Sequence, residues 1–255
     1  MAKTLTIIGL QTMPIIKEGD DIPALIIEAC KREGVSIEDG DIIVVTQKIV
    51  SKAEGRVYDL EIITPSKKAM ELGEATQRDP RLIELVLSDT AEVVKATPEG
   101  LIVRNIQGNV CLNAGADRSN VPGETIYSLL PVNPDESSKI IRKGLQKIIN
   151  KRIAVIITDT YSRPFRRGQV DLAIGFSGIF PFRDYRHTGD LYGKELRVKN
   201  TTIIDEIASA SELVIGQSTE AIPVSIVKNL TWEDSEVGMS EISLSKEEDM
   251  FKGAL

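Results

Sequence analysis

The residues Ile153-Ala154-Val155-Ile156-Ile157 run directly into Thr158-Asp159-Thr160, and this stretch decides the fold prediction. Five consecutive apolar residues, four of them β-branched, are typical of a strand that is covered on both faces. Amphipathic helices are expected on either side of it in the sequence, over 137–150 and 203–215. The pattern therefore predicts a sheet with helices packed against it, and polar side chains where the central strand ends.

Working outward from this strand, the remaining sequence alternates between short apolar runs and helical patterns. A helix is expected from Pro23 to about residue 32, with Asp20 or Asp21 as its cap and Gly34 as its stop. The segment 66–94 is predicted to form two helices that are separated at Asp79-Pro80. Further strands are expected at residues 5–8, 42–45, 101–104, 110–112 and 222–227, the third and fourth forming a hairpin.

Two segments do not follow this alternation of short apolar runs and helical patterns. Residues 165–192 are rich in glycine and arginine and show no clear period, so no element is predicted there. Ser245-Lys246-Glu247-Glu248 has the pattern of a capping box, which predicts that a last helix begins at this point.

Composition places the chain among ordinary globular proteins. It has 255 residues, of which 42% are hydrophobic and 27% charged, enough for one large domain or two small ones. No apolar run approaches the roughly 20 residues of a membrane span, and the N-terminus lacks a signal-peptide pattern. A net charge of −7 disfavours non-specific binding of nucleic acid. We expect a cytoplasmic protein with small-molecule substrates, and neither a membrane nor a nucleic acid as its partner.

The counts of cysteine and histidine restrict the chemistry. Cys30 and Cys111 cannot form a disulfide framework and are expected to be reduced. His187, the single histidine, excludes any metal site that needs two imidazoles, and we expect it to be exposed and idle. The available ligands are oxygen atoms, which select hard cations such as Mg²⁺ or Mn²⁺.

Thr158-Asp159-Thr160 is the first candidate for functional chemistry. Ligands collect at the carboxyl ends of strands in sheets that are covered by helices, and an acidic residue there can hold a cation together with a hydroxyl group. The alternative is that Asp159 caps the following turn.

A second candidate is the polar loop 113–120, which follows an expected strand and carries Asp117 and Asn120. The alternative is a turn that bonds to its own backbone.

Arginines and lysines supply positive charge near these carboxylates. Arg163, Arg166 and Arg167 lie just after the central strand, and guanidinium groups bind phosphates and carboxylates bidentately. The alternative is a solvated run of charge. Lys48 and Lys52, with Gln47, follow another expected strand, and lysines at such a place contact phosphates as point charges. Most surface lysines have no such role.

Two common nucleotide-binding motifs are missing. The sequence contains neither the glycine-rich loop of Walker-type NTPases nor a Gly-x-Gly-x-x-Gly motif after a strand. These absences disfavour a Walker-type NTPase and a standard dinucleotide-binding dehydrogenase.

Taken together, eight stretches resemble the coenzyme F420-0:L-glutamate ligase family. They lie in order along nearly the whole chain, at residues 13–21, 40–45, 51–55, 108–121, 156–160, 165–168, 190–193 and 222–223. The resemblance implies an α+β fold with mixed sheets and packed helices, two intimately joined subdomains, and an intertwined homodimer. It also implies that residues 1–255 form a single ligase unit without the reductase-like domain that is fused to some bacterial relatives.

The resemblance also assigns roles to individual residues. Asp117 and Asp159 would hold one divalent cation, and Thr160 and Gln217 a second, as Mg²⁺ or Mn²⁺; a monovalent cation is a further candidate. The residues implied to contact GTP are Met13, Pro14, Ile15, Ile16, Gln47, Lys48, Lys52, Asn120, Ile215, Gly216, Gln217, Ser218, Thr219, Glu220, Ala221 and Ile222. Arg166 and Arg167 are our candidates for anchoring anionic substrate or phosphate groups in catalysis.

The implied activity is GTP-dependent addition of L-glutamate to the deazaflavin coenzyme F420-0, with further γ-linked glutamates as an option. An acyl phosphate would form first, and GDP and phosphate would be released. Many relatives have Asn-Gly where this chain has Tyr161-Ser162, so the acceptor substrate is less constrained than the nucleotide. The alternatives are a ligase of this family with a different carboxylate acceptor and a nucleotide-binding protein without catalysis.

Overall fold

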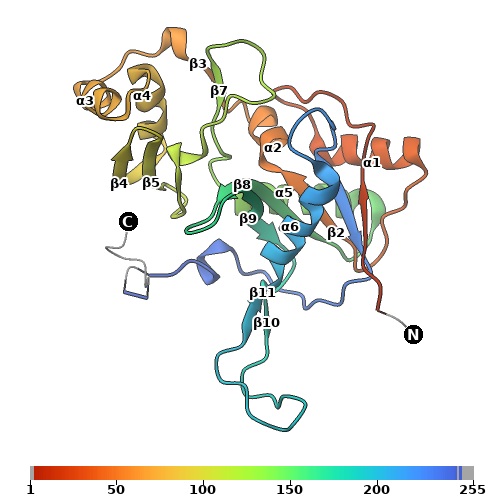
Figure 1. The fold of residues 1–255 in the computed structure, drawn as a ribbon. Coiled ribbons are helices and arrows are strands. Elements are labelled where there is room, and N and C mark those ends of the chain that lie inside the picture. Colours follow the sequence, from red (N-terminus) through yellow and green to blue (C-terminus); the bar gives the residue numbers. More distant parts are fainter. Residues whose placement is uncertain (1–2, 246, 249–255) are drawn as a thin grey trace.

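The computed structural model describes residues 3–245 and 247–248 and has an α+β architecture with mixed sheets (Figure 1). The α-helices are α1 (Ile22–Glu33), α2 (Gln47–Ala53), α3 (Lys67–Thr76), α4 (Pro80–Ser88), α5 (Pro134–Ile149) and α6 (Ile203–Ile215). The strands are β1 (Thr6–Gly9), β2 (Ile42–Thr46), β3 (Val57–Asp59), β4 (Thr90–Thr97), β5 (Gly100–Asn105), β6 (Val110–Leu112), β7 (Ile126–Ser128), β8 (Ala154–Ser162), β9 (Gln169–Ser177), β10 (Phe182–Asp184), β11 (Asn200–Thr202) and β12 (Val224–Lys228). Short 3₁₀ helices are η1 (Leu60–Ile62), η2 (Asn113–Gly115) and η3 (Met239–Glu241).

A five-stranded sheet in the order β1-β12-β2-β8-β9 forms the centre of the molecule. β2 and β8 run parallel, with Thr46 opposite Thr158, and the other neighbours are antiparallel. The ends of β2 and β8 therefore lie at one edge, together with the start of β12, where Val224 pairs with Val45. Asp171 near the start of β9 is opposite Thr160, so β9 brings a carboxyl group to the same edge.

Both faces of this sheet are covered, as the apolar sequence of β8 predicts. Side chains from α1, α2 and α5 pack on one face, around Ile43, Val155 and Ile157. Side chains from α6, together with Trp232, pack on the other face, around Val44 and Ile156. α1 begins as expected: Asp21 Oδ1 accepts a hydrogen bond from the Ala24 amide (3.1 Å), and Gly34 ends the helix at a φ of 65°.

A second hydrophobic cluster lies to one side of the central sheet. α3 and α4 pack against the three-stranded sheet β4-β5-β6, with Ile83, Val86 and Leu101 buried between them (Figure 1). The loop that follows β6 leads back toward the central sheet, where Asp117 pairs with Ser128 at the end of β7 through two backbone hydrogen bonds of 3.0 and 2.8 Å. The two-stranded ribbon β10-β11 projects away from the body of the molecule (Figure 1). No helix among the described residues is long and apolar enough to cross a membrane.

Most of the expected elements are present, but α2, β3, β7, β10 and β11 have no counterpart in the prediction, and two further differences concern residues 90–94 and β9. The segment 90–94 is not helical, because α4 ends at Ser88 and β4 begins at Thr90. β4 contains four β-branched residues and gains a hydrogen-bonded partner in β5, which outweighs local helix propensity. β9 is also missing from the prediction, although Val170, Leu172, Ile174 and Phe176 alternate with the period of a strand. The helix expected after residue 245 lies largely outside the described residues; within them, Ser245 and Glu248 form the reciprocal bonds of a capping box.

Candidate functional site

A pocket of about 840 Å³ opens at the edge of the central sheet where β2 and β8 end. This volume suits a nucleotide or another small molecule. One side, which we call the sheet wall, consists of Thr158–Ser162, Gln169, Asp171 and residues 215–223. The other side, which we call the loop wall, consists of Val110–Asn113, Gly115–Asp117, Ser119 and Asn120, together with residues of α2. The segment Met13–Ile16 completes the lining.

The pocket brings together the residues that the sequence assigns to nucleotide and cations. Every one of them lines it, from Met13–Ile16 and Gln47, Lys48 and Lys52 to Asp117, Asn120, Asp159, Thr160 and residues 215–222. Arg166 and Arg167 are placed differently, since both are exposed in the turn between β8 and β9 and neither is among the described lining residues. Ser162 and Gln169, which flank this turn, do line the pocket, so the arginines lie next to its rim.

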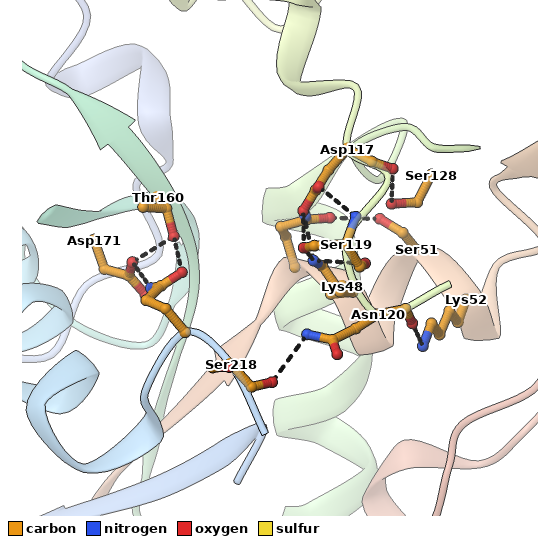
Figure 2. A network of polar contacts seen from close by, with 12 residues as sticks. Lys48, Ser51, Lys52, Asp117, Ser119, Asn120, Ser128, Thr160, Asp171 and Ser218 are labelled. Atoms are coloured by element: carbon orange, nitrogen blue, oxygen red, sulfur yellow. Dashed lines mark hydrogen bonds and ion pairs between the residues drawn. The ribbon is translucent and has the colours of Figure 1, made fainter. Parts of the chain in front are cut away.

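On the sheet wall, Asp171 is the centre of a hydrogen-bond network (Figure 2). Its Oδ1 accepts from Thr160 Oγ1 (2.8 Å) and from Gln217 Nε2 (3.2 Å), and its Oδ2 accepts from Thr158 Oγ1 (3.1 Å). Thr160 Oγ1 and Gln217 Oε1 are 3.1 Å apart. Asp171 is only 2% exposed. The two residues predicted to share one cation are thus neighbours, and a buried carboxyl group connects them.

Asp159 is adjacent to this network and has an unusual proton affinity. Burial raises the pKa of its carboxyl group to about 7, and the neighbouring carboxylates of Asp171 and Asp117 add to the rise. Hydrogen bonding from the Thr160 backbone and the charge of Lys48 act in the opposite direction. Burial also raises the pKa of Asp171, against the hydrogen bonds that it accepts. The sheet wall therefore holds two carboxyl groups that are costly to ionise.

On the loop wall, the carboxylate of Asp117 forms an ion pair with Lys48 of α2 (Figure 2). Lys48 Nζ also donates to the carbonyl oxygen of Ser119 (2.9 Å), and the Ser119 amide and hydroxyl donate to Asp117 (2.7 and 2.8 Å). Burial would raise the pKa of Asp117, but the hydrogen bonds from Lys48 and Ser119 outweigh it and hold the pKa below its usual value. Asp117 is therefore ionised at neutral pH.

Lys52 and Asn120 connect the same loop to its surroundings. Lys52 Nζ donates to the carbonyl oxygen of Asn120 (2.6 Å), and burial together with the charge of Lys48 lowers the pKa of Lys52. Asn120 Nδ2 reaches across the pocket to the carbonyl oxygen of Ser218 (3.4 Å; Figure 2). Two closely spaced ammonium groups in a concave site favour an anionic ligand such as a polyphosphate.

The backbone of the loop wall is in an uncommon conformation. Asn113, Ala114 and Gly115 have consecutive φ values of 51°, 53° and 76°, in the left-handed region that alanine rarely adopts. Asn113 Oδ1 accepts a hydrogen bond from the Leu101 amide (2.9 Å), which ties the turn to β5. Asn120 and Ala221, from the two walls, both have a φ of 55°. Such conformations persist only where the surroundings enforce them, and they concentrate at binding sites.

Cys111 and Tyr161 meet where β6 approaches β8. Burial raises the pKa of the Cys111 thiol to about 12, so this side chain remains protonated and is not an activated nucleophile. Tyr161 lines the pocket and also packs against the apolar core beneath the sheet. The bulk of Tyr161 is thus partly accommodated by the core.

The donor atoms of the pocket fit hard cations. No three His, Cys, Asp or Glu side chains in the described part of the chain are close enough to form a cation site by themselves. Asp117 and Asp159, which face the same pocket, together with Thr160 Oγ1 and Gln217 Oε1, nevertheless provide carboxylate, hydroxyl and amide oxygens. Oxygen donors of this kind suit Mg²⁺ or Mn²⁺, which retain water in the remaining positions.

Asp171 is the residue at this site that sequence reasoning missed. It lies within the segment 165–192, for which no element was predicted, although the alternation from Val170 to Phe176 would have placed it on a strand. Recognition of that strand as the antiparallel neighbour of β8 would have put Asp171 opposite Thr160.

Comparisons with known proteins agree with the sequence resemblance. Residues 10–229 match the sequence profile of the family described as F420-0:Gamma-glutamyl ligase. The coenzyme F420:L-glutamate ligase of Methanothermobacter thermautotrophicus is 39% identical over 251 residues, which cover 98% of this chain and 99% of that protein. The proteins of the same name from Methanocaldococcus jannaschii and Archaeoglobus fulgidus are 39% and 40% identical, over 98% and 96% of each chain.

Proposed function

The chain belongs to the F420-0:gamma-glutamyl ligase family, and from this premise we propose that it is a GTP-dependent ligase which joins L-glutamate to the deazaflavin coenzyme F420-0. The observation that carries the proposal is the pocket itself. It gathers Lys48 and Lys52, the carboxyl groups of Asp117 and Asp159, and the Thr160–Gln217 pair around a space of nucleotide size. The names of the relatives support the ligated amino acid and the coenzyme.

The chemistry requires activation of a carboxylate. The acceptor carboxylate oxygen attacks the γ-phosphorus of GTP, the bond to the β-phosphate oxygen breaks, and GDP leaves. The glutamate nitrogen, after loss of a proton, then attacks the acyl carbon and expels phosphate. Each step transfers a group between substrates, so no protein nucleophile is required, in agreement with the high pKa of Cys111.

The residues of the pocket have complementary tasks in this scheme. Lys48 and Lys52 supply fixed positive charge for phosphate oxygens. Asp117 and Asp159 would hold one divalent cation, and Thr160 and Gln217 a second. Bound cations would neutralise charge on the phosphoryl oxygens as it develops. Because Lys48 is paired with Asp117, binding of a cation at Asp117 would release the ammonium group of Lys48 toward an anionic ligand.

The direct test is a product assay. The protein is incubated with GTP, Mn²⁺, L-glutamate and F420-0, and mass spectrometry is used to detect the glutamylated coenzyme. Acceptor labelled with ¹⁸O in its terminal carboxylate distinguishes the routes, because an acyl phosphate delivers one ¹⁸O to inorganic phosphate. GMP and pyrophosphate as products would contradict the proposal, and nucleotide binding without product would indicate a non-catalytic protein.

A further inference from the structure

The buried carboxyl group of Asp171 has a role beyond those described above. It is 2% exposed, yet it accepts hydrogen bonds from three side chains that line the pocket: Thr158, Thr160 and Gln217. Two of these three are the residues proposed to hold the second cation. Asp171 therefore contacts both members of that pair from the sheet wall, where it is almost fully buried.

The protons in this network can be counted. Thr160 has one hydroxyl proton, and two oxygen atoms are within reach of it: Asp171 Oδ1 at 2.8 Å and Gln217 Oε1 at 3.1 Å. The bond to Asp171 Oδ1 is the shorter of the two, so the hydroxyl proton is assigned to Asp171. The lone pairs of Thr160 Oγ1 and Gln217 Oε1 then face each other at 3.1 Å without a proton between them.

Asp171 also fixes the direction of the Gln217 amide. Gln217 Nε2 donates to Asp171 Oδ1 (3.2 Å), which turns Oε1 toward Thr160. With the amide reversed, an N–H group would face Thr160 Oγ1 and repel a cation. Two lone-pair oxygens held side by side repel each other, and a cation that contacts both of them relieves the repulsion.

We propose that Asp171 is a positioning residue that withdraws the protons of Thr160 and Gln217 from the pocket, so that both present lone pairs to the same divalent cation. This inference rests on the proposed function for the presence of that cation. It explains why an aspartate is buried at a position where a β-sheet alone would favour an apolar or β-branched residue. Outer partners of this kind orient the ligands of metal sites generally.

The test is a titration of the protein with Mn²⁺ in the presence of GTP. The electron paramagnetic resonance signal of free Mn²⁺ measures how much of the ion is bound, and a titration of GTP alone is the reference. The wild-type protein with GTP bound is expected to hold two ions in total, including any ion that GTP binds alone. Asp171→Asn is expected to retain the ion at Asp117 and Asp159 and to bind the other about ten- to a hundred-fold more weakly. An asparagine amide can donate to Thr160 or Gln217, which disturbs the arrangement of lone pairs without a large change in volume.

Asp205→Asn is the matched control. Asp205 on α6 is another shielded carboxyl group with a raised pKa, caused by burial, and it accepts a hydrogen bond from the Ala173 amide of β9 (3.0 Å). It is not among the described residues that line the pocket. This variant is expected to bind both ions with wild-type affinity, which separates loss of a buried charge near β9 from loss of the Asp171 contacts.

The outcomes are distinguishable. Equal affinity of Asp171→Asn and wild type for both ions would overturn the inference, as would uptake of a single ion by wild type. If Asp171→Asn retains one ion, the variant is folded. If Asp171→Asn retains no ion, Asp171→Glu, which preserves the carboxylate, is the second test. Asp171→Glu must then bind both ions, or the inference fails. Failure of the proposed function would appear separately, as wild-type protein that binds both ions but forms no glutamylated product.

Discussion

The two walls of the pocket carry the same kind of side chain in opposite electrostatic states. On the sheet wall, burial raises the pKa of Asp159 to about 7, and the carboxyl group of Asp171 behind it contributes to the rise. On the loop wall, Lys48 and Ser119 hold the pKa of Asp117 below its usual value. The partners of each aspartate, and not the residue type, decide whether it is charged in the free protein.

The difference follows from how each wall is built. Asp159 and Asp171 lie on adjacent strands of a covered sheet, where hydroxyl and amide groups are the nearest partners. Asp117 lies on a loop, and its cationic partner comes from α2, directly after β2. A cation that binds between Asp117 and Asp159 would therefore replace a lysine on one side and a proton on the other. The following variants test this difference between the two walls.

The largest effect is expected from Asp159→Asn, which removes the carboxyl group that we propose as a cation ligand on the sheet wall. Ligation should fall by about a hundred-fold or more, because few anionic groups hold the cation that neutralises the phosphoryl oxygens. Steady-state rates with GTP, glutamate and the deazaflavin acceptor measure the loss. Asp205→Asn, which removes a carboxyl group outside the pocket, serves as the control, and near wild-type activity of Asp159→Asn would refute the role of Asp159.

The second prediction concerns how the Asp159 carboxyl group affects the free energy of unfolding of the metal-free protein at different pH values. The pKa of Asp159 in the folded state, about 7, lies above the value near 3.8 expected when unfolded. The folded state therefore binds the proton more tightly, and this contribution to stability is lost as the pH rises from about 4 to 7. Asp159→Asn should match wild type near pH 4 and exceed its free energy of unfolding by about 1–4 kcal/mol at pH 8.

Urea unfolding in the presence of a chelator measures this difference, with the fluorescence of the buried Trp232 as the signal. A stability difference that does not change with pH would show that Asp159 is not protonated in the folded protein.

Part of the pocket could be predicted from the sequence, because it follows from local sequence pattern. The apolar run before Thr158 identified the central strand, and its polar end located Asp159 and Thr160 without any structure. The pairing of β2 with β8 then explains why Lys48 and Asp159 share an edge. These are consequences of local pattern and of the geometry of parallel strands, which sequence encodes directly.

What sequence did not show was contact between distant segments. Asp171 was missed because the glycine- and arginine-rich segment hid the alternation of β9, and Gln217 had no local signal apart from the family resemblance. The sequence predicts helix over 90–94, where β4 begins, because the partner strand β5 comes later in the chain and provides the deciding hydrogen bonds. Arg166 and Arg167 are close to Thr160 in sequence, yet the hairpin carries them outward to an exposed turn.

A third prediction tests the loop wall. Lys48→Met removes the partner of Asp117 and one positive charge from the pocket. Loss of a charge-assisted contact of about 1.5–3 kcal/mol should raise the KM for GTP by roughly ten- to a hundred-fold. Lys67→Met, at an exposed lysine that pairs with Glu71 on α3, is the control. Equal KM values for Lys48→Met and wild type would mean that Lys48 serves only to hold the loop.

The smallest effect is expected at the exposed turn that adjoins the sheet wall. Arg166→Lys and Arg167→Lys keep the positive charge but lose the planar fork that binds carboxylate or phosphate bidentately. Both side chains are exposed, so a contact to an anionic substrate is worth about 0.2–1 kcal/mol, or a rise in KM of about 1.4- to five-fold. Because the variants keep the charge and lose only the bidentate geometry, the rise should be similar at low and at high ionic strength. KM values for GTP, glutamate and acceptor, measured at two salt concentrations, identify which substrate is affected. If neither variant changes any KM at either salt concentration, these arginines are a solvated run of charge, and recognition of anions is confined to the lysines of the loop wall and the cations.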